Sequence, residues 1–116
     1  MAKLWHLYKI EFEGVLIYIG VTNDLVNRRS GHSARRFIPF RGGSMTVIRS
    51  FRKRPQALDA EVAAIREHMP IGNFRSNPIG YASVKDRDLA VHTKLAELER
   101  QRYIRLYPDV IEALKT

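Results

Sequence analysis

The sequence predicts an α/β (α+β) fold with a small central antiparallel β-sheet of about three strands flanked by helices. Three segments rich in β-branched and aromatic residues occupy the first half of the chain. Apolar residues at helical spacing dominate the second half. The 116 residues, 45% of them hydrophobic, correspond to one small domain with one compact core.

The first two strands form a hairpin. They cover residues 3–12 and 14–20, and the second contains an apolar run enclosed between two glycines. We expect a three-residue loop ending at Gly14, because glycine readily adopts the left-handed conformation that such a loop requires. This loop places Tyr8 opposite Tyr18 on one face of the sheet, whereas a two-residue loop places them on opposite faces.

A helix follows the second strand. Gly20 lets the chain turn, and Thr22 or Asn23 can accept a hydrogen bond from a free amide at the start of the helix. Because Arg28 and His32 are four residues apart, they project from the same face of this helix. The sequence therefore brings a guanidinium and an imidazole together.

A third strand over residues 45–51 precedes a helix over residues 55–68, with Pro55 in its first turn. Glu61 lies at the edge of the apolar stripe of this helix, where a carboxylate requires a partner. From helical periodicity alone, Glu61 is a rim carboxylate paired with an arginine. The residues of the apolar stripe are Leu58, Val62, Ile65 and Met69.

The last part of the chain is predicted to be mainly helical. Residues 79–88 read as a loop or short strand, residues 88–106 as a helix, and residues 109–115 as a short helix after Pro108. The apolar side of the long helix carries Val91, Leu95 and Leu98. This extension either packs on the domain or provides a dimer or DNA contact.

Positive charge is concentrated in one segment. The net charge is +8, and residues 25–58 contain no Asp or Glu. The planar guanidinium suits phosphate oxygens, so this clustering predicts contact with nucleic acid, although solubility alone also explains surface charge. The nine basic residues are Arg28, Arg29, Arg35, Arg36, Arg41, Arg49, Arg52, Lys53 and Arg54.

Composition excludes several classes of protein. The chain has no cysteine, which excludes a disulfide framework and a thiolate zinc site and is compatible with a reducing cytoplasm. No run of about 18 apolar residues is present, so no membrane span or membrane partner is expected. The first five residues do not resemble the start of a signal peptide, and we expect a cytoplasmic protein.

A set of spaced residues resembles the GIY-YIG nucleases. Tyr18-Ile19-Gly20 matches the second half of the family motif, and His6-Leu7-Tyr8 aligns with the first half. The sequence departs from the family at His6, which replaces glycine, and at Val21, where some relatives carry lysine. At the family's intervals follow Arg28, His32, Glu61, Pro70 and Asn73. The resemblance covers roughly residues 4 to 78, and the joint pattern is more specific than any one piece.

The resemblance implies a metal-dependent DNA endonuclease, structure-directed or weakly sequence-specific. Residues 1–78 would form the catalytic core and residues 79–116 the helical extension. Glu61 would hold Mg²⁺ or Mn²⁺, and Arg28 would neutralise charge on the phosphoryl oxygens. The implied catalytic residues are Tyr8, Tyr18, Arg28, His32 and Glu61, supported by Gly20 and Asn73.

Three details stay open at this stage. Either Tyr8 or Tyr18 would accept a proton from the attacking water, with Tyr8 slightly favoured, and His32 would orient that group or relay the proton. Asn73 is either a loop cap or a residue that pins the backbone near the site. The expected DNA contacts come from Arg29, Arg35, Arg36, Arg41, Arg52, Lys53 and Arg54.

Two other classes of function fit parts of the sequence. A non-catalytic nucleic-acid-binding protein on the same fold explains the charge, but it needs none of the catalytic set in register. A protein-interaction module that binds an acidic partner through the helical extension explains the charge but not the tyrosines. Salt dependence separates phosphate binding from apolar docking, because phosphate contacts weaken steeply as salt rises.

Overall fold

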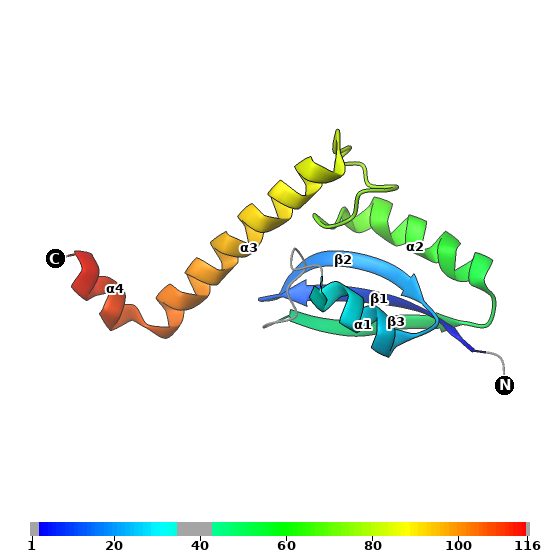
Figure 1. Cartoon of the computed structure of the whole chain (residues 1–116), viewed down its shortest axis with the longest axis horizontal. Helices are drawn as coiled ribbons and strands as arrows, with labels where there is room; N and C mark the ends of the chain where they lie inside the picture. Colours follow the sequence, from blue (N-terminus) through cyan, green and yellow to red (C-terminus); the bar gives the residue numbers. More distant parts are fainter. Residues whose placement is uncertain (1–2, 35–42, 116) are drawn as a thin grey trace.

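The computed structural model describes residues 3–34 and 43–115, and these form an α+β fold (Figure 1). The sheet has three antiparallel strands, as predicted, and their order is β2-β1-β3. Its strands are β1 (Trp5–Phe12), β2 (Val15–Thr22) and β3 (Gly43–Phe51). The helices in the described ranges are α1 (Leu25–Ala34), α2 (Arg54–His68), α3 (Val84–Leu106) and α4 (Pro108–Lys115).

The turn between β1 and β2 is shorter than predicted. Phe12 pairs directly with Val15, so the loop has two residues rather than three. Glu13 and Gly14 both have positive φ, at 50° and 75°. Two left-handed residues in sequence are typical of a type I′ turn, whose twist matches the flanking strands. The expectation for Gly14 is therefore met, but Glu13 also adopts the left-handed conformation.

A β-bulge then changes the register of the hairpin. Glu11 pairs with Leu16, whereas Ile10 pairs with Tyr18, so Ile17 is an extra residue in β2. Beyond it Tyr8 pairs with Gly20 and not, as predicted, with Tyr18. Because Tyr18 lies opposite Ile10, two residues from Tyr8, both tyrosines still project from one face. The bulge thus restores the shared face that a two-residue loop alone would have abolished.

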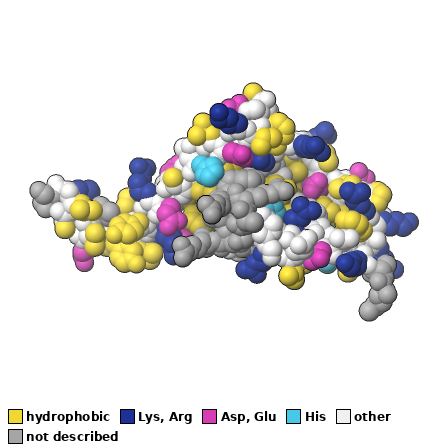
Figure 2. All heavy atoms as spheres, in the orientation of Figure 1, with side chains coloured by type: hydrophobic (Ala, Val, Ile, Leu, Met, Phe, Trp, Pro, Cys, Tyr) yellow, Lys and Arg dark blue, Asp and Glu magenta, His cyan; other side chains and the backbone are white. Residues whose placement is uncertain are grey.

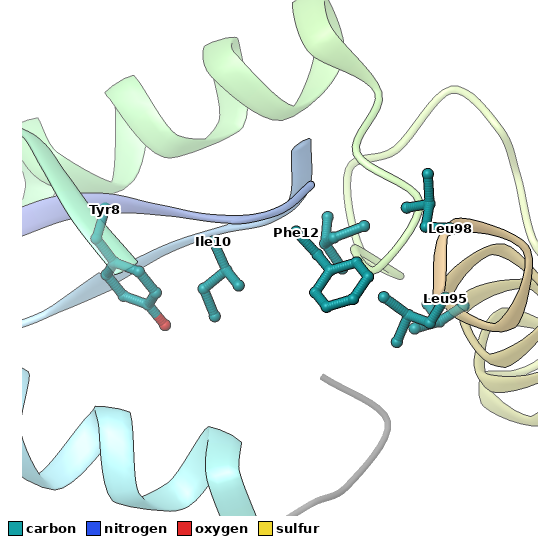
Figure 3. Packing of buried hydrophobic residues seen from close by; sticks show 7 residues of the cluster. Tyr8, Ile10, Phe12, Leu95 and Leu98 are labelled. Carbon is teal, nitrogen blue, oxygen red and sulfur yellow. The ribbon is translucent and has the colours of Figure 1, made fainter. Parts of the chain in front are cut away.

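Helices cover both faces of the sheet. On one face, α2 packs over a cluster centred on Leu7, Ile19 and Ile65. The other face carries a larger cluster, to which α3 contributes side chains beside Phe12 (Figure 3). The buried members of this larger cluster are Tyr8, Ile10, Phe12, Ile17, Val91, Leu95 and Leu98. The expected apolar side of the long helix is therefore buried, while the division of the chain at residue 78 remains a prediction.

The buried face of α2 differs from the predicted stripe. Met69 is 49% exposed and takes a left-handed conformation at the end of the helix. The residues that approach the sheet are mainly small, namely Ala57, Ala60, Ala64 and Ile65. Small side chains allow a helix to lie close to its neighbour, and this inner face includes position 61 by helical spacing. Glu61 therefore belongs to the side of α2 that faces the sheet.

Helix α3 begins earlier than predicted. It starts at Val84, not Asp88, because the Ser83 side chain accepts a hydrogen bond from the backbone N–H of Asp86 at 3.1 Å. Near its other end, Arg102 and Arg105 contact the Glu13 carboxylate of the hairpin turn at 3.2 and 2.8 Å. The last turns of α3 are thus tied to the hairpin turn between β1 and β2.

The fold is elongated, with extents of 61 × 33 × 23 Å, and α4 lies farthest from the sheet (Figure 1). Large apolar side chains are exposed at this end, namely Tyr103, Ile104, Leu106, Tyr107, Val110 and Leu114. Among the described helices, none combines the length and the apolar character that a membrane crossing requires.

Candidate functional site

The candidate site lies along the outer edge of β2, where the loop after α2 replaces a neighbouring strand. The Asn73 side chain accepts a hydrogen bond from Ile19 N–H at 2.9 Å and donates one to the Ile19 carbonyl at 2.8 Å. Gly72 N–H donates to the Ile17 carbonyl at 2.7 Å, and a Cβ at Gly72 would lie only 2.6 Å from that oxygen. Asn73 is buried, and both halves of its amide bind the backbone of Ile19, so it orients β2 at the site.

Helix α1 carries His32 to the inner side of the site. The N-cap of α1 is Asp24, whose carboxylate accepts a hydrogen bond from Asn27 N–H at 3.1 Å. The prediction of Thr22 or Asn23 as the cap is therefore wrong. Thr22 holds the backbone just before the helix, because its hydroxyl accepts a hydrogen bond from Asp24 N–H at 3.0 Å. These local bonds fix the direction in which α1 leaves β2.

A buried hydrogen bond joins β1 to α1. Tyr8 Oη lies 2.7 Å from His32 Nε2, and the exposed fractions of the two side chains are 1% and 2%. The Tyr18 ring packs edge-on against the His32 ring, with centroids 4.9 Å apart, and lies 6.2 Å from the Tyr8 ring. The structure therefore brings the two tyrosines and the histidine that the sequence analysis singled out into one cluster.

Gly20 has a different role from the one predicted. It does not begin a turn, since β2 continues to Thr22. A Cβ at Gly20 would lie 2.6 Å from Cζ of Tyr8 and 2.8 Å from Cε1 of Tyr18, well inside van der Waals contact. Glycine is thus needed at this position because the Tyr8 phenol occupies the space of a side chain.

A cavity of about 310 Å³ opens beside this cluster, and Tyr18 and Glu61 both line it. Tyr18 is half-buried, in contrast to the fully enclosed Tyr8. The complete lining is Tyr18, Glu61, Ile65, Asn73, Phe74, Arg75, Ser76, Val84 and Arg87. Strand β2, helix α2, the following loop and the start of α3 therefore all contribute to the cavity.

The charge of Glu61 is controlled by its surroundings. Burial raises the pKa of the Glu61 carboxyl above its ordinary value, while a hydrogen bond from the Val21 backbone and the Arg28 guanidinium lower it in part. Arg28 is exposed on α1, yet its charge reaches the Glu61 carboxylate. Arg28 does not line the cavity itself, so its effect on Glu61 is electrostatic and comes from the neighbouring helix.

The side chains that line the cavity fit a hard divalent cation whose other ligands would be water and substrate oxygens. Within the described ranges, no group of three His, Asp or Glu side chains converges to form a metal cage. Mg²⁺ usually keeps several waters and binds through one or two carboxylates together with substrate phosphates. Glu61 offers one such carboxylate at the wall of an open cavity large enough to hold waters. It must be ionised to do so, so its raised pKa makes protons and metal compete.

Part of the predicted basic surface can be located. Since β2 and β3 both end beside the start of β1, the first turns of α1 and the β3–α2 connection lie at the same end of the sheet. Figure 2 shows Lys and Arg side chains gathered over this right-hand part of the molecule. Exposed there are Arg28, Arg29, Arg52, Lys53 and Arg54, whereas Arg35, Arg36 and Arg41 lie outside the described residues.

Two basic residues stack on aromatic rings. The Arg54 guanidinium lies 5.4 Å from the ring centre of Trp5, and that of Arg49 lies 4.9 Å from the ring centre of Phe51. Such contacts hold long side chains in place while their charge stays accessible.

Sequence reasoning missed two residues of the site, Arg75 and Arg87, which line the cavity. Arg75 lies only two residues after Asn73, so its proximity to a motif residue was an available signal. Arg87 lies in the first turn of α3, in a segment that the sequence assigned to a loop or short strand. The capping pattern of Ser83 and Asp86 could have identified that helix start.

Comparisons with family models, curated proteins and solved structures found no match to this chain.

Proposed function

We propose that this protein is a metal-dependent DNA endonuclease that hydrolyses phosphodiester bonds. The observation that carries the proposal is that Tyr18 and Glu61 share one solvent-open cavity, with Arg28 acting electrostatically on the Glu61 carboxylate. The buried Tyr8–His32 pair lies directly behind Tyr18. Apolar packing has no need for this combination of groups, whereas phosphoryl chemistry uses each of them.

Each charged group has a task in this proposal. Glu61 would hold Mg²⁺ or Mn²⁺, and the ion when bound supplies charge neutralisation for the phosphate and the leaving oxygen. Arg28 stabilises negative charge on the non-bridging phosphoryl oxygens, for which a planar guanidinium is suited. The Val21 N–H, by bonding the Glu61 carboxylate, orients it and favours its ionised form.

Tyr18, in its deprotonated phenolate form, is our choice for the residue that accepts the proton of the attacking water. It lines the cavity, whereas Tyr8, slightly favoured from the sequence, is only 1% exposed. A general base must come within hydrogen-bond reach of the proton that it removes. Tyr8 and His32 then act as positioning residues, because they fix the ring against which Tyr18 packs.

The basic end of the sheet supports DNA as the substrate. Exposed arginine and lysine side chains on α1 and at the start of α2 contact phosphates irrespective of base sequence. Such contacts give affinity and position rather than base readout, which supports a structure-directed or weakly sequence-specific enzyme. A homodimer also remains a proposal, supported by the exposed apolar side chains at the end of α3 and on α4.

The decisive experiment compares Glu61→Gln with Asp59→Asn in cleavage of plasmid, linear, branched and single-stranded DNA with Mg²⁺ or Mn²⁺. Asp59 is an exposed carboxylate of the same helix that does not line the cavity, so it is a matched control. We expect Glu61→Gln to reduce cleavage at least about 100-fold while DNA binding persists, and Asp59→Asn to cleave normally. Equal cleavage by both variants would contradict the assigned role of Glu61.

The alternative function is a non-catalytic nucleic-acid-binding protein on the same fold. The exposed basic end of the sheet also fits this function. Absence of cleavage of every substrate by the wild type, together with tight and salt-sensitive DNA binding, would favour it over the nuclease.

A further inference from the structure

Two arginines are among the residues that line the cavity. The loop after Asn73 supplies Arg75, and the first turn of α3 supplies Arg87. The C-terminal extension therefore contributes to the cavity that contains Glu61. The Arg87 guanidinium is bonded to protein oxygens, whereas Arg75 is exposed at the cavity, so Arg75 is the guanidinium that can bind an anion there.

Arg87 is firmly positioned. Its Nη1 donates to the Gly72 carbonyl at 3.2 Å, and its Nε donates to the Asp88 carboxylate at 2.7 Å. The segment before α3 provides a second hydrogen bond to the same loop. Tyr81 Oη donates to the Ile71 carbonyl at 2.8 Å. Arg87 thus joins α3 to the loop segment that runs along the edge of β2.

Arg75 lies between two anchored asparagines. Asn73 is bonded to Ile19, and the Asn77 amide donates to the carbonyls of Pro70 at 2.7 Å and Asn73 at 3.0 Å. Ser76 adopts a left-handed conformation, with φ of 61°, between these anchors. The backbone that carries Arg75 is therefore fixed, while its side chain is exposed at the cavity. A cation on a fixed backbone loses less entropy when it binds an anion.

We propose that Arg75 binds a non-scissile phosphate of the DNA strand that enters the cavity, with Arg87 as a positioning residue that holds the loop. The ligand is a DNA phosphodiester, and this identification rests on the proposed function. The guanidinium is exposed, always charged and able to make two parallel bonds to phosphate oxygens. The start of α3 thereby becomes part of the substrate-binding surface.

The test measures binding of a labelled DNA duplex by fluorescence anisotropy, without divalent metal so that no cleavage occurs. Arg75→Gln should raise Kd about tenfold and make the negative slope of log affinity against log salt shallower by about 0.9, the value for one lost phosphate contact. The control is Arg66→Gln, which removes the same charge from an exposed site on α2 outside the cavity. It should leave both quantities nearly unchanged.

Arg75→Lys sharpens the result, because it should keep the salt slope and lose part of the affinity. Equal, small losses for Arg75→Gln and Arg66→Gln would overturn the proposal. The two proposals can also fail separately. Wild type that cuts DNA while Arg75→Gln binds normally would refute the role of Arg75 alone. Selective weakening by Arg75→Gln in a protein that cuts no DNA would refute the nuclease and support the phosphate site.

Discussion

The inner and outer sides of the candidate site differ in almost every physical respect. Gly20, Tyr8 and His32 on the inner side are enclosed, closely packed and joined by a short hydrogen bond. Tyr18, Glu61 and Arg75 on the outer side border a cavity and are half-buried or exposed. The inner side therefore determines stability and geometry, while the outer side remains accessible to a ligand. Substitutions on the two sides should separate these properties.

The largest effect is expected on the inner side, from Gly20→Ala. The added Cβ would lie 2.6 Å from Cζ of Tyr8, so the enclosed ring or the strand must move. Overpacking of this kind typically costs 1–3 kcal/mol, and we expect about 3 kcal/mol because the neighbours are rigid rings. Chemical denaturation of the variant measures the loss.

Gly31→Ala is the matched control for this prediction. Gly31 lies in α1, and a Cβ there would meet no atom within 4 Å. Alanine is favoured over glycine inside a helix by about 0.5–1 kcal/mol, so this variant should be slightly more stable than the wild type. If the two variants were equally stable, the close fit between Gly20 and Tyr8 would not hold in solution.

The next effect contrasts the two tyrosines. Tyr18→Phe should reduce DNA cleavage about 100-fold, because the proposed base is lost from the cavity. Tyr8→Phe removes the buried bond to His32 and should lower the free energy of unfolding by about 1–1.5 kcal/mol. Cleavage rates and denaturation curves of both variants check the assignment. A much larger loss of cleavage in Tyr8→Phe than in Tyr18→Phe would identify the inner tyrosine as the base.

The smallest effect concerns the pH dependence of stability on the outer side. Burial raises the pKa of the Glu61 carboxyl above its ordinary value of 4.5, so the folded state binds this proton more tightly than the unfolded chain. The resulting stability is fully present below the unfolded pKa and is lost as pH rises through the folded pKa.

Glu61→Gln cannot ionise, so it should be more stable than the wild type at pH 7. Because the group is half-exposed and screened by solvent, we expect a gain on the order of 0.5 kcal/mol. Denaturation at pH 4 and pH 7 measures it, and the gain should disappear at the lower pH. A gain that is equal at both pH values would show that it does not come from ionisation of Glu61.

Local signals in the sequence predicted most of the elements. The β-branched strands, Gly14 in the turn and Pro55 in the first turn of α2 depend on neighbouring residues, and the structure has them. The side of the long helix that carries Val91 and Leu95 was also correctly assigned, because it has a plain apolar periodicity. Such features need no knowledge of distant contacts.

Features that depend on distant contacts were not predicted. The bulge at Ile17 lies in the buried core, and no residue type in the sequence indicates its position. The role of Gly20 could be predicted only by knowing that the Tyr8 phenol lies against it. On α2 the predicted stripe was right at Ile65, which is buried, but it included the exposed Met69 and missed the alanines that allow the helix to approach the sheet. Arg87 joins the cavity only through the path that the chain takes after Asn77.

The bulge at Ile17 separates the two ends of the hairpin. A regular hairpin with a three-residue loop over 13–15 would give the same pairing of Tyr8 with Gly20, because the extra residue would then lie in the loop. The alignment near the site thus tolerates a change of turn type. The turn end of the hairpin can therefore diverge in sequence independently of the site. At that end Glu13 forms ion pairs with Arg102 and Arg105 of α3.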